Sequence, residues 1–166
     1  MLSPLMCLCF LVRDGGDGST YVLLGKKKRG LGAGNVVGLG GKVEPNEDAR
    51  AAAVREVAEE SGVVVDPRDL EERAFIDFRF PTKPSWDQQA AVFVARRWQG
   101  DPVETDEITP TWYDVDAIPI DAMWSDARHW LPQVLAGRRL SADFTFQNDL
   151  RTLASARVDV EDSSVR

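Results

Sequence analysis

The fold follows from one part of the chain, Gly41-Lys42-Val43-Glu44-Pro45-Asn46-Glu47, then seven residues, then Arg55-Glu56-Val57-Ala58-Glu59-Glu60-Ser61-Gly62-Val63. Its alanine-rich middle predicts a helix over residues 45–60, because alanine has the highest intrinsic helix propensity. We expect Asn46 to cap this helix and two acidic residues to lie in its first turn, where the helix dipole favours negative charge. Gly62 suits the left-handed residue that ends a helix. The glycines before the helix predict a loop or bulged strand over residues 35–42.

Three carboxylates lie on one face of this predicted helix. Glu56, Glu59 and Glu60 are spaced i, i+3, i+4, so they repel one another near the helix end where the dipole disfavours anions. Arg55 relieves part of the repulsion because it can pair with Glu59 one turn on. One interpretation is an acidic, solvated helix face, and the other is a site for Mg²⁺ or Mn²⁺. The glycine-rich loop favours the metal site, since its backbone offers ligands to ions and phosphate.

The same part of the chain resembles the Nudix box, G-x5-E-x7-R-E-U-x-E-E-x-G-U with U apolar. It matches at nine fixed positions, namely Gly41, Glu47, Arg55, Glu56, Val57, Glu59, Glu60, Gly62 and Val63. Outside the box, residues 23–34 and 38–42 are similar to the MutT-type 8-oxo-dGTP diphosphatases, most of all to the animal oxidised-purine nucleoside triphosphatases of that group. Downstream segments that contain Phe78, Glu107, Trp124 and Phe144 are similar to the same group in the same order.

The resemblance implies an α/β protein with the Nudix fold, a mixed β-sheet sandwiched between α-helices. Residues 1–160 then form a single Nudix domain, with the box at residues 41–63, and residues 161–166 form a loose C-terminal tail. Turn residues and apolar runs are compatible with that fold. They predict strands over residues 5–12, 21–24, 70–80, 90–95, 111–115, 144–146 and 153–160, and a second helix over about 123–135.

The resemblance also implies the chemistry. The metal ligands are expected to be Glu56, Glu59, Glu60, Glu107 and the carbonyl of Gly40, and the catalytic residues are the same four glutamates with Arg55, which orients the box carboxylates. The cofactor is expected to be Mg²⁺, with Mn²⁺ as the alternative ion. Such ions neutralise a triphosphate and lower the pKa of water. Either Glu60 or Glu107 then accepts the proton as the general base, and the sequence leaves that choice open.

On the substrate side, the resemblance implies contacts from Lys27, Asn35, Val37, Leu39, Gly40, Gly41, Lys42, Phe78, Trp124, Ser125, Asp126 and Ala127. Trp124 matches a tryptophan that stacks on the purine, and Phe78 matches an aromatic residue on the pocket wall. Asp126 matches the first of two aspartates that read the oxidised base. Ala127 replaces the second aspartate, and Val37 replaces a purine-reading asparagine. Because a lost polar contact is worth about 1–3 kcal/mol, these two departures predict a relaxed or changed base specificity.

The expected function is metal-dependent hydrolysis of oxidised purine nucleoside triphosphates such as 8-oxo-dGTP to the monophosphate and pyrophosphate, which cleans the nucleotide pool. A same-fold alternative is hydrolysis of another nucleoside diphosphate derivative, such as a nucleotide sugar, ADP-ribose or an ordinary dNTP, and Val37 and Ala127 favour it. A non-catalytic nucleotide-binding module is a third hypothesis. The complete set of Glu56, Glu59 and Glu60 argues against it.

The composition sets the class of partner. The 166 residues amount to one ordinary domain with a net charge of -7, which disfavours DNA and RNA polymers because phosphate neutralisation drives most of their non-specific binding. A small nucleotide stays compatible, since a metal ion supplies positive charge. No apolar run approaches the roughly 20 residues that cross a bilayer, so no membrane partner is expected. Cys7 and Cys9 lie on one face of a strand and are not expected to pair, which predicts a cytoplasmic protein. We expect a monomer.

Overall fold

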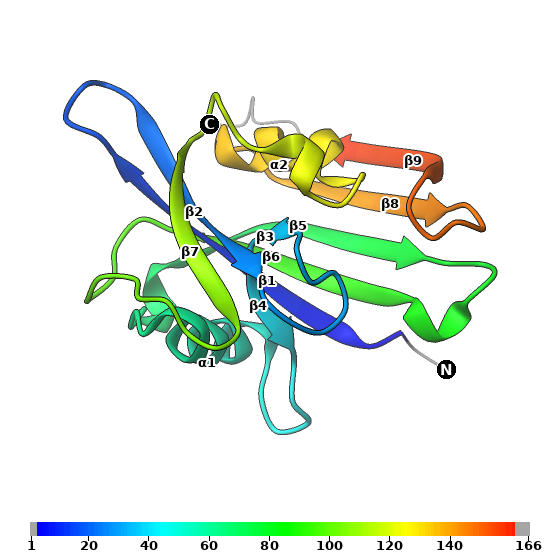
Figure 1. Ribbon diagram of the computed structural model, residues 1–166, viewed down its shortest axis with the longest axis horizontal. Coiled ribbons are helices and arrows are strands. Elements are labelled where there is room, and N and C mark those ends of the chain that lie inside the picture. The colour runs from blue at the N-terminus through cyan, green and yellow to red at the C-terminus, as the bar shows by residue number, and fades with distance from the viewer. Residues whose placement is uncertain (1–2, 162–166) are drawn as a thin grey trace.

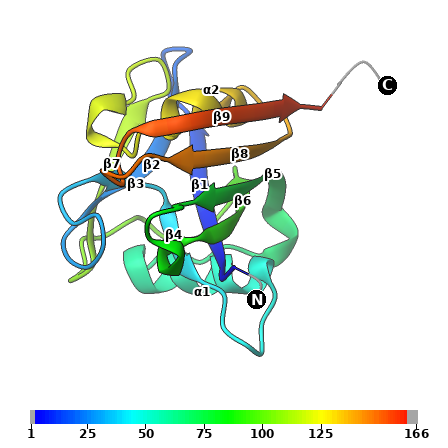
Figure 2. The ribbon, with the colours of Figure 1, turned by 90° about the vertical axis from the view of Figure 1, so that its right-hand side faces the viewer.

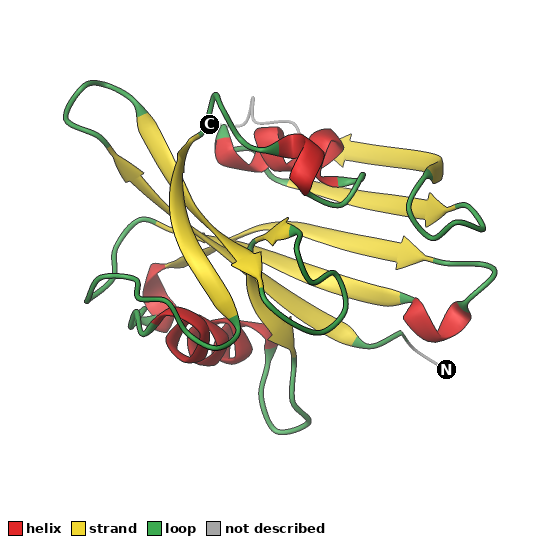
Figure 3. Ribbon diagram, viewed as in Figure 1, coloured by secondary structure: helices red, strands yellow, loops and turns green. Residues whose placement is uncertain are grey.

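The computed structural model describes residues 3–161 and contains one nine-stranded mixed sheet and two α-helices, as Figure 3 shows. The strands are β1 (Leu5–Asp14), β2 (Thr20–Lys27), β3 (Val36–Val37), β4 (Leu39–Lys42), β5 (Leu70–Arg79), β6 (Gln88–Ala95), β7 (Ile108–Asp114), β8 (Leu140–Phe146) and β9 (Leu153–Val160). The helices are α1 (Ala49–Ser61) and α2 (Ala127–Leu135), with short 3₁₀ turns η1 (Pro67–Asp69), η2 (Pro84–Trp86) and η3 (Ile120–Ala122). The strand order is β3-β2-β1-β6-β5-β8-β9, with β4 paired to β1 and β7 paired to β2. The pairs β1–β6 and β5–β8 are parallel, which confirms the predicted mixed sheet.

Strand β1 forms the centre of the sheet because its apolar run pairs with three neighbours. It is antiparallel to β2 near its end and to β4 near its start, and it is parallel to β6 along most of its length. Cys7 and Cys9 of this strand are fully buried and unpaired, as predicted. Burial raises the pKa of the Cys7 thiol to about 11 and raises the pKa of Cys9 as well. Both cysteines are therefore small core residues and unreactive at neutral pH.

The sheet separates two apolar cores, and each is covered by one helix (Figures 1 and 2). One core packs α1 against β1, β4 and β6 and includes Leu39 and Val57. The other packs α2 against the opposite face and includes Phe10, Trp130 and Phe144. Figure 1 shows α1 below the sheet and α2 above it. This arrangement confirms the predicted sheet sandwiched between helices.

Helix α1 begins later than the sequence predicts. Asp48 caps it, because the Asp48 Oδ1 accepts a hydrogen bond from the Ala51 N–H at 2.8 Å. Residues 44–47 form a turn instead, in which the Glu47 carboxylate accepts from the Glu44 N–H at 2.9 Å. The predicted Asn46 cap is therefore wrong, and no acidic residue lies in the first turn of α1.

Two other boundaries differ from the prediction. The second helix begins at Ala127 and not at Met123, because residues 120–122 form η3 and the following segment turns before α2 starts. The Ser125 hydroxyl donates to the Arg151 carbonyl at 2.5 Å, which ties that segment to the β8–β9 connection. Residues 35–42, expected as a loop or bulged strand, form the short strands β3 and β4 on either side of Gly38. Most of the predicted tail, residues 162–166, lies outside the described residues.

Neither α-helix in the described part of the chain is long and apolar enough to cross a membrane.

Candidate active site

Two glutamates of helix α1 lie directly against strand β4. The Gly40 N–H donates a hydrogen bond to the Glu60 Oε1 at 2.8 Å. A Cβ atom added to Gly41 would lie 1.7 Å from the Glu56 Oε2, and one added to Gly40 would lie 1.9 Å from the Cys7 carbonyl oxygen. Gly40 is therefore required, because the backbone of β1 leaves no room for a Cβ atom, whereas a larger residue at position 41 would have to displace the Glu56 carboxylate.

Arg55 organises the carboxylates around it. Its guanidinium lies 2.5 Å from the Glu47 Oε1, 3.2 Å from the Glu59 carboxylate and 3.6 Å from the Glu56 Oε1. It also donates to the Lys42 carbonyl at 3.0 Å, which joins the helix to the end of β4. The hydrogen bond to Glu47 is the largest influence that raises the Arg55 pKa. Arg55 thus offsets the repulsion between the glutamates and fixes where they lie.

Burial gives two glutamates an unusual proton affinity. It raises the pKa of Glu56 to about 7, and the neighbouring Arg55 opposes the shift only in part. It raises the pKa of Glu60 to about 8, and the hydrogen bond from Gly40 opposes that shift. The negative charge of Glu107 raises both values further. Burial therefore outweighs the neighbouring positive charges of Arg55 and Lys27 in setting these two pKa values.

Glu107 and Lys27 come to the same place from other parts of the sheet. Glu107 lies on the loop before β7, where its carbonyl accepts a hydrogen bond from the Lys28 N–H at 2.9 Å. Its charge acts on both Glu56 and Glu60, as the pKa values of these two show. Lys27, at the end of β2, lowers the pKa of Glu60. The fold therefore gathers one cationic and three acidic side chains from three separate parts of the sequence.

The donor set at this site fits a hard divalent cation. Its side chains offer carboxylate oxygens, the ligands that Mg²⁺ and Mn²⁺ prefer. Burial and then repulsion between the glutamates raise the pKa values of Glu56 and Glu60, and a bound cation would favour their charged forms. Within residues 3–161, no three His, Cys, Asp or Glu side chains converge closely enough to form a ready metal cluster. The reason is local, because Glu59 is exposed and turned to Arg55 while Glu60 accepts from Gly40. The Gly40 N–H donates to the Glu60 carboxylate. Metal binding by the Gly40 carbonyl oxygen stays a prediction.

Several residues expected on the base side lie around the α2 face of the sheet. Trp124 lies against the glycine-rich loop, since a Cβ atom on Gly32 would be 3.2 Å from the indole Nε1. Asp126 is 4% exposed and accepts a hydrogen bond from the Trp130 Nε1–H at 2.8 Å. Burial raises the pKa of Asp126. Ala127 is buried beside it. The structure therefore brings a buried carboxyl group near the tryptophan that is expected to stack on a base.

Trp130 is a residue that the sequence analysis did not assign to the site. Its spacing of i, i+4 from Asp126 puts the two on one helix face, which is the only sequence signal for this hydrogen bond. The Phe10 ring packs edge-to-face on Trp130, with ring centroids 5.9 Å apart. Gly38, between β3 and β4, approaches Phe10 so closely that an added Cβ would lie 2.7 Å from the ring. Trp130 thus connects Asp126 to the central strand β1.

The remaining residues that are predicted to contact the substrate lie in several different elements. The Phe78 ring stacks on the Phe144 ring, with ring centroids 6.1 Å apart. Val37 is half-buried and pairs with Gly25 of β2. Asn35 closes the glycine-rich loop, with its N–H bonded to the Gly32 carbonyl at 2.9 Å. Lys42 is exposed at the end of β4.

Leu39 requires a correction. Its side chain is 0% exposed and packs in the core beneath α1. The predicted substrate contact by this side chain is therefore wrong, because β4 turns it away from solvent.

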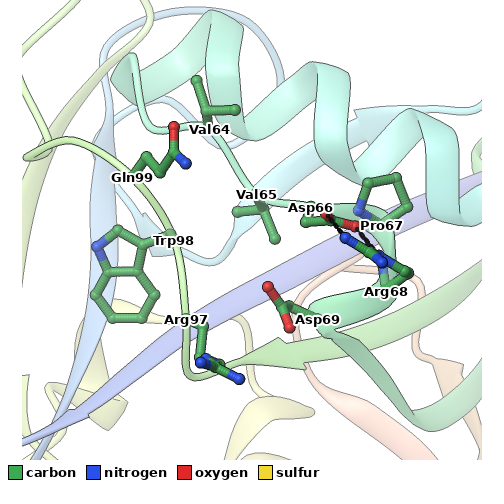
Figure 4. A pocket seen from close by; sticks show the side chains of 9 residues that line it. All are labelled: Val64, Val65, Asp66, Pro67, Arg68, Asp69, Arg97, Trp98 and Gln99. Atoms are coloured by element: carbon green, nitrogen blue, oxygen red, sulfur yellow. Dashed lines mark hydrogen bonds and ion pairs between the residues drawn. The ribbon is translucent and has the colours of Figure 1, made fainter.

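A cavity of about 780 Å³ lies elsewhere, between η1 and the segment that follows β6 (Figure 4). Its lining consists of Val64, Val65, Asp66, Pro67, Arg68, Asp69, Arg97, Trp98 and Gln99. The Asp66 and Arg68 side chains at its rim pair with each other at 2.8 Å. None of the residues predicted for the active site lines this cavity. We therefore place the candidate active site at the glutamates beside β4.

The sequence profile of the NUDIX domain matches residues 5–134. The chain belongs to the Nudix family. Nudix hydrolases generally need divalent metal ions, in agreement with the carboxylate donors beside β4.

Known relatives support the same assignment across most of the chain. A Danio rerio protein named oxidized purine nucleoside triphosphate hydrolase is 41% identical over 145 residues, which is 87% of this chain and 88% of the relative. A Mus musculus protein of the same name is 37% identical over 140 residues, 84% of this chain and 88% of the relative. The crystal structure of a MutT protein from Bacillus halodurans superposes with a TM-score of 0.76 at 25% identity, over 94% of this chain and 97% of that chain. The predicted Nudix fold is thus confirmed.

Proposed function

We propose that this Nudix enzyme hydrolyses oxidised purine nucleoside triphosphates such as 8-oxo-dGTP to the nucleoside monophosphate and pyrophosphate. The observation that carries the proposal is the pair of partly buried carboxylates, Glu56 and Glu60, packed against the glycines of β4. The relatives named for hydrolysis of oxidised purine nucleoside triphosphates support the substrate class.

The proposed mechanism assigns a role to each charged side chain. Glu56, Glu59, Glu60 and Glu107 would hold a divalent cation, which when bound would neutralise the charge of the triphosphate and lower the pKa of water. Glu60 is the proposed general base, because its carboxylate lies beside β4 among the other acidic side chains of the site and can accept a proton when it is ionised. Glu107 is the alternative base. Lys27 offers its ammonium group to the phosphates. The base accepts a proton from water as the water oxygen attacks phosphorus and pyrophosphate leaves.

The proposed base recognition combines stacking with one buried carboxyl group. The Trp124 ring offers a face for the purine, and Asp126 offers a group that is held by Trp130 and favours its protonated form because of burial. Val37 and Ala127 offer no polar atom from their side chains. We therefore propose that Asp126 reads the base without a second side-chain carboxyl beside it.

The proposal also covers the metal ion, the cellular location and the oligomeric state. The ion is Mg²⁺, which Mn²⁺ can replace, because both are hard cations that prefer oxygen ligands. The protein acts in the cytoplasm, which the two unpaired, buried cysteines support. It acts as a monomer, and size-exclusion chromatography with light scattering tests that state.

Product analysis tests the reaction directly. With 8-oxo-dGTP and Mg²⁺, ³¹P NMR should show pyrophosphate and the monophosphate in equal amounts, with no free phosphate. A matched sample with excess EDTA should show neither product. Release of free phosphate and a diphosphate would contradict the proposed bond cleavage.

Gly41→Ala is expected to lower kcat by about 10–100-fold, because the new Cβ would overlap the Glu56 carboxylate and displacement of a reacting group by about 1 Å has effects of this size. Steady-state kinetics and thermal unfolding measure the effect. Gly16→Ala is the matched control, since no atom lies within 4 Å of a Cβ added there. Unchanged kcat in Gly41→Ala would show that the position of Glu56 is not critical.

Val37→Asn is expected to raise the preference for 8-oxo-dGTP over dGTP by about tenfold, which lies within the range for one regained polar contact. The ratio of the two kcat/KM values measures it. Val64→Asn makes the same change at a 54% exposed position that is not among the predicted site residues and should leave the ratio unchanged. An unchanged ratio in Val37→Asn would remove this residue from base recognition.

A further inference from the structure

The loop between β6 and β7 is fastened to the end of helix α1. The last carbonyl groups of a helix have no partner within the helix, and here the loop supplies partners for two of them. The Val103 N–H donates to the Ser61 carbonyl at 2.9 Å. The Thr105 hydroxyl donates to the Glu60 carbonyl at 3.0 Å. The helix end that carries Glu60 is thus bonded to the loop that carries Glu107.

The Thr105 hydroxyl makes further contacts that continue the connection. Its oxygen accepts hydrogen bonds from the Glu107 N–H at 3.3 Å and, more weakly, from the Ile108 N–H at 3.5 Å. A hydroxyl group has one donor and two acceptor sites, so all its hydrogen-bonding capacity is used. One oxygen atom therefore connects the backbone of Glu60 to the backbone of Glu107.

The backbone of Glu107 is held on its other side as well. Its carbonyl accepts from the Lys28 N–H at 2.9 Å, and the Lys28 ammonium group pairs with Glu104 of the same loop. The Glu107 side chain itself is exposed, and within the described residues its carboxylate takes part in no hydrogen bond or ion pair. Its place beside Glu56 and Glu60 therefore depends on how its peptide groups are fixed.

We propose that Thr105 is a positioning residue whose hydroxyl group sets the separation between the Glu60 and Glu107 carboxylates. The inference rests on the proposed function, in which both glutamates hold a divalent cation. It extends that function to a residue that touches neither substrate nor ion. Without the hydroxyl group, the Glu60 carbonyl and the Glu107 N–H both lose their partner, and the loop is free to shift relative to α1.

Thr105→Val removes the hydroxyl group and keeps the shape of the side chain. We expect it to lower kcat about tenfold with a smaller change in KM for 8-oxo-dGTP, since the loss concerns the placement of reacting groups. We also expect the affinity of the protein for Mn²⁺ alone, measured by electron paramagnetic resonance, to fall several-fold. Thr105→Ser keeps the hydroxyl group and should restore both values. Thr109→Val is the matched control, because within residues 3–161 the one hydrogen bond of its hydroxyl is to the exposed Glu104, at 3.4 Å.

Thermal unfolding separates positioning from stability. If Thr105→Val and Thr105→Ser lose similar amounts of stability but only the valine variant loses kcat and Mn²⁺ affinity, the positioning role is supported. Parent-like kcat and Mn²⁺ affinity in Thr105→Val would overturn it, and so would equal losses in the serine variant. Glu107→Gln distinguishes the two proposals. If that variant loses activity while Thr105→Val does not, only the role of Thr105 fails, whereas a fully active Glu107→Gln removes Glu107 from the site and the inference with it.

Discussion

Replacing Glu60 by glutamine is expected to lower kcat by roughly 10³-fold, the scale on which a general base contributes, while the fold stays intact. The glutamine carbonyl oxygen can still accept the hydrogen bond that Gly40 now donates to the Glu60 Oε1 at 2.8 Å. The neutral amide carries no charge for a divalent cation and accepts no proton. Because burial raises the pKa of Glu60 to about 8, removal of the charge should keep or raise the Tm of the metal-free protein in alkaline solution.

The control for this variant is Glu72→Gln, which changes an exposed glutamate on β5 in the same way. Its kcat for 8-oxo-dGTP and its Tm should equal those of the parent protein. A kcat of Glu60→Gln within about tenfold of the parent value, with Tm retained, would be too small a loss for a general base. Glu107 would then be the base to test.

Removal of divalent ions is expected to abolish hydrolysis and to make the stability of the protein fall as the pH rises from about 5 to 8. Glu56 and Glu60 have pKa values of about 7 and 8 in the folded protein, above their ordinary value of 4.5. Between the ordinary and the raised values, the folded state holds more protons than the unfolded state. The free energy of unfolding therefore decreases with rising pH in this window and is highest below it. Each pKa unit corresponds to roughly 1.4 kcal/mol. Because both side chains are partly exposed and solvent screens them, we expect the free energy of unfolding to fall by less than the sum of the two shifts, on the order of a few kcal/mol.

Calorimetry of the EDTA-treated protein at several pH values measures this slope. Mg²⁺ should raise Tm most at the alkaline end, where both carboxylates are charged and bind the cation best. The double variant Glu56→Gln/Glu60→Gln is the control and should lose both the slope and the response to Mg²⁺. A Tm that stays level or rises across this window in the metal-free parent protein would contradict the raised pKa values of Glu56 and Glu60.

The sequence predicts the main elements because their signals are local. The apolar run of β1 and the alanine-rich segment of α1 need no knowledge of the rest of the chain. The helix start was placed wrongly because it depends on distant contacts, since Arg55 and Glu44 both bond to the Glu47 carboxylate and keep the preceding turn out of the helix. The division between β3 and β4 likewise depends on the ring of Phe10, which lies against Gly38.

In the candidate site, too, the sequence does not predict the contacts that form only when separate parts of the chain meet. The i, i+3, i+4 spacing puts three glutamates on one face, and the sequence also predicts the Arg55–Glu59 pair that the structure contains. Only the fold shows that Glu60 accepts a hydrogen bond from Gly40. Leu39 was misassigned because a short strand gives no sign of which side of the sheet each residue faces. The hydroxyl of Thr105 has no sequence signal, because its partners come together only when the loop meets the end of α1.

The most direct test of the proposed function measures kcat/KM for hydrolysis of the phosphoanhydride bond with Mg²⁺. The substrates to compare are 8-oxo-dGTP, 2-oxo-dATP, dGTP, dATP, dCTP and ADP-ribose. We expect an oxidised purine to be preferred by about tenfold or more, or about 1.4 kcal/mol at the transition state. That result would mean that the pocket around Trp124 and Asp126 reads the lesion although Val37 and Ala127 carry no polar side-chain atom. A level profile across the triphosphates, or a preference for ADP-ribose, would contradict the proposed substrate class.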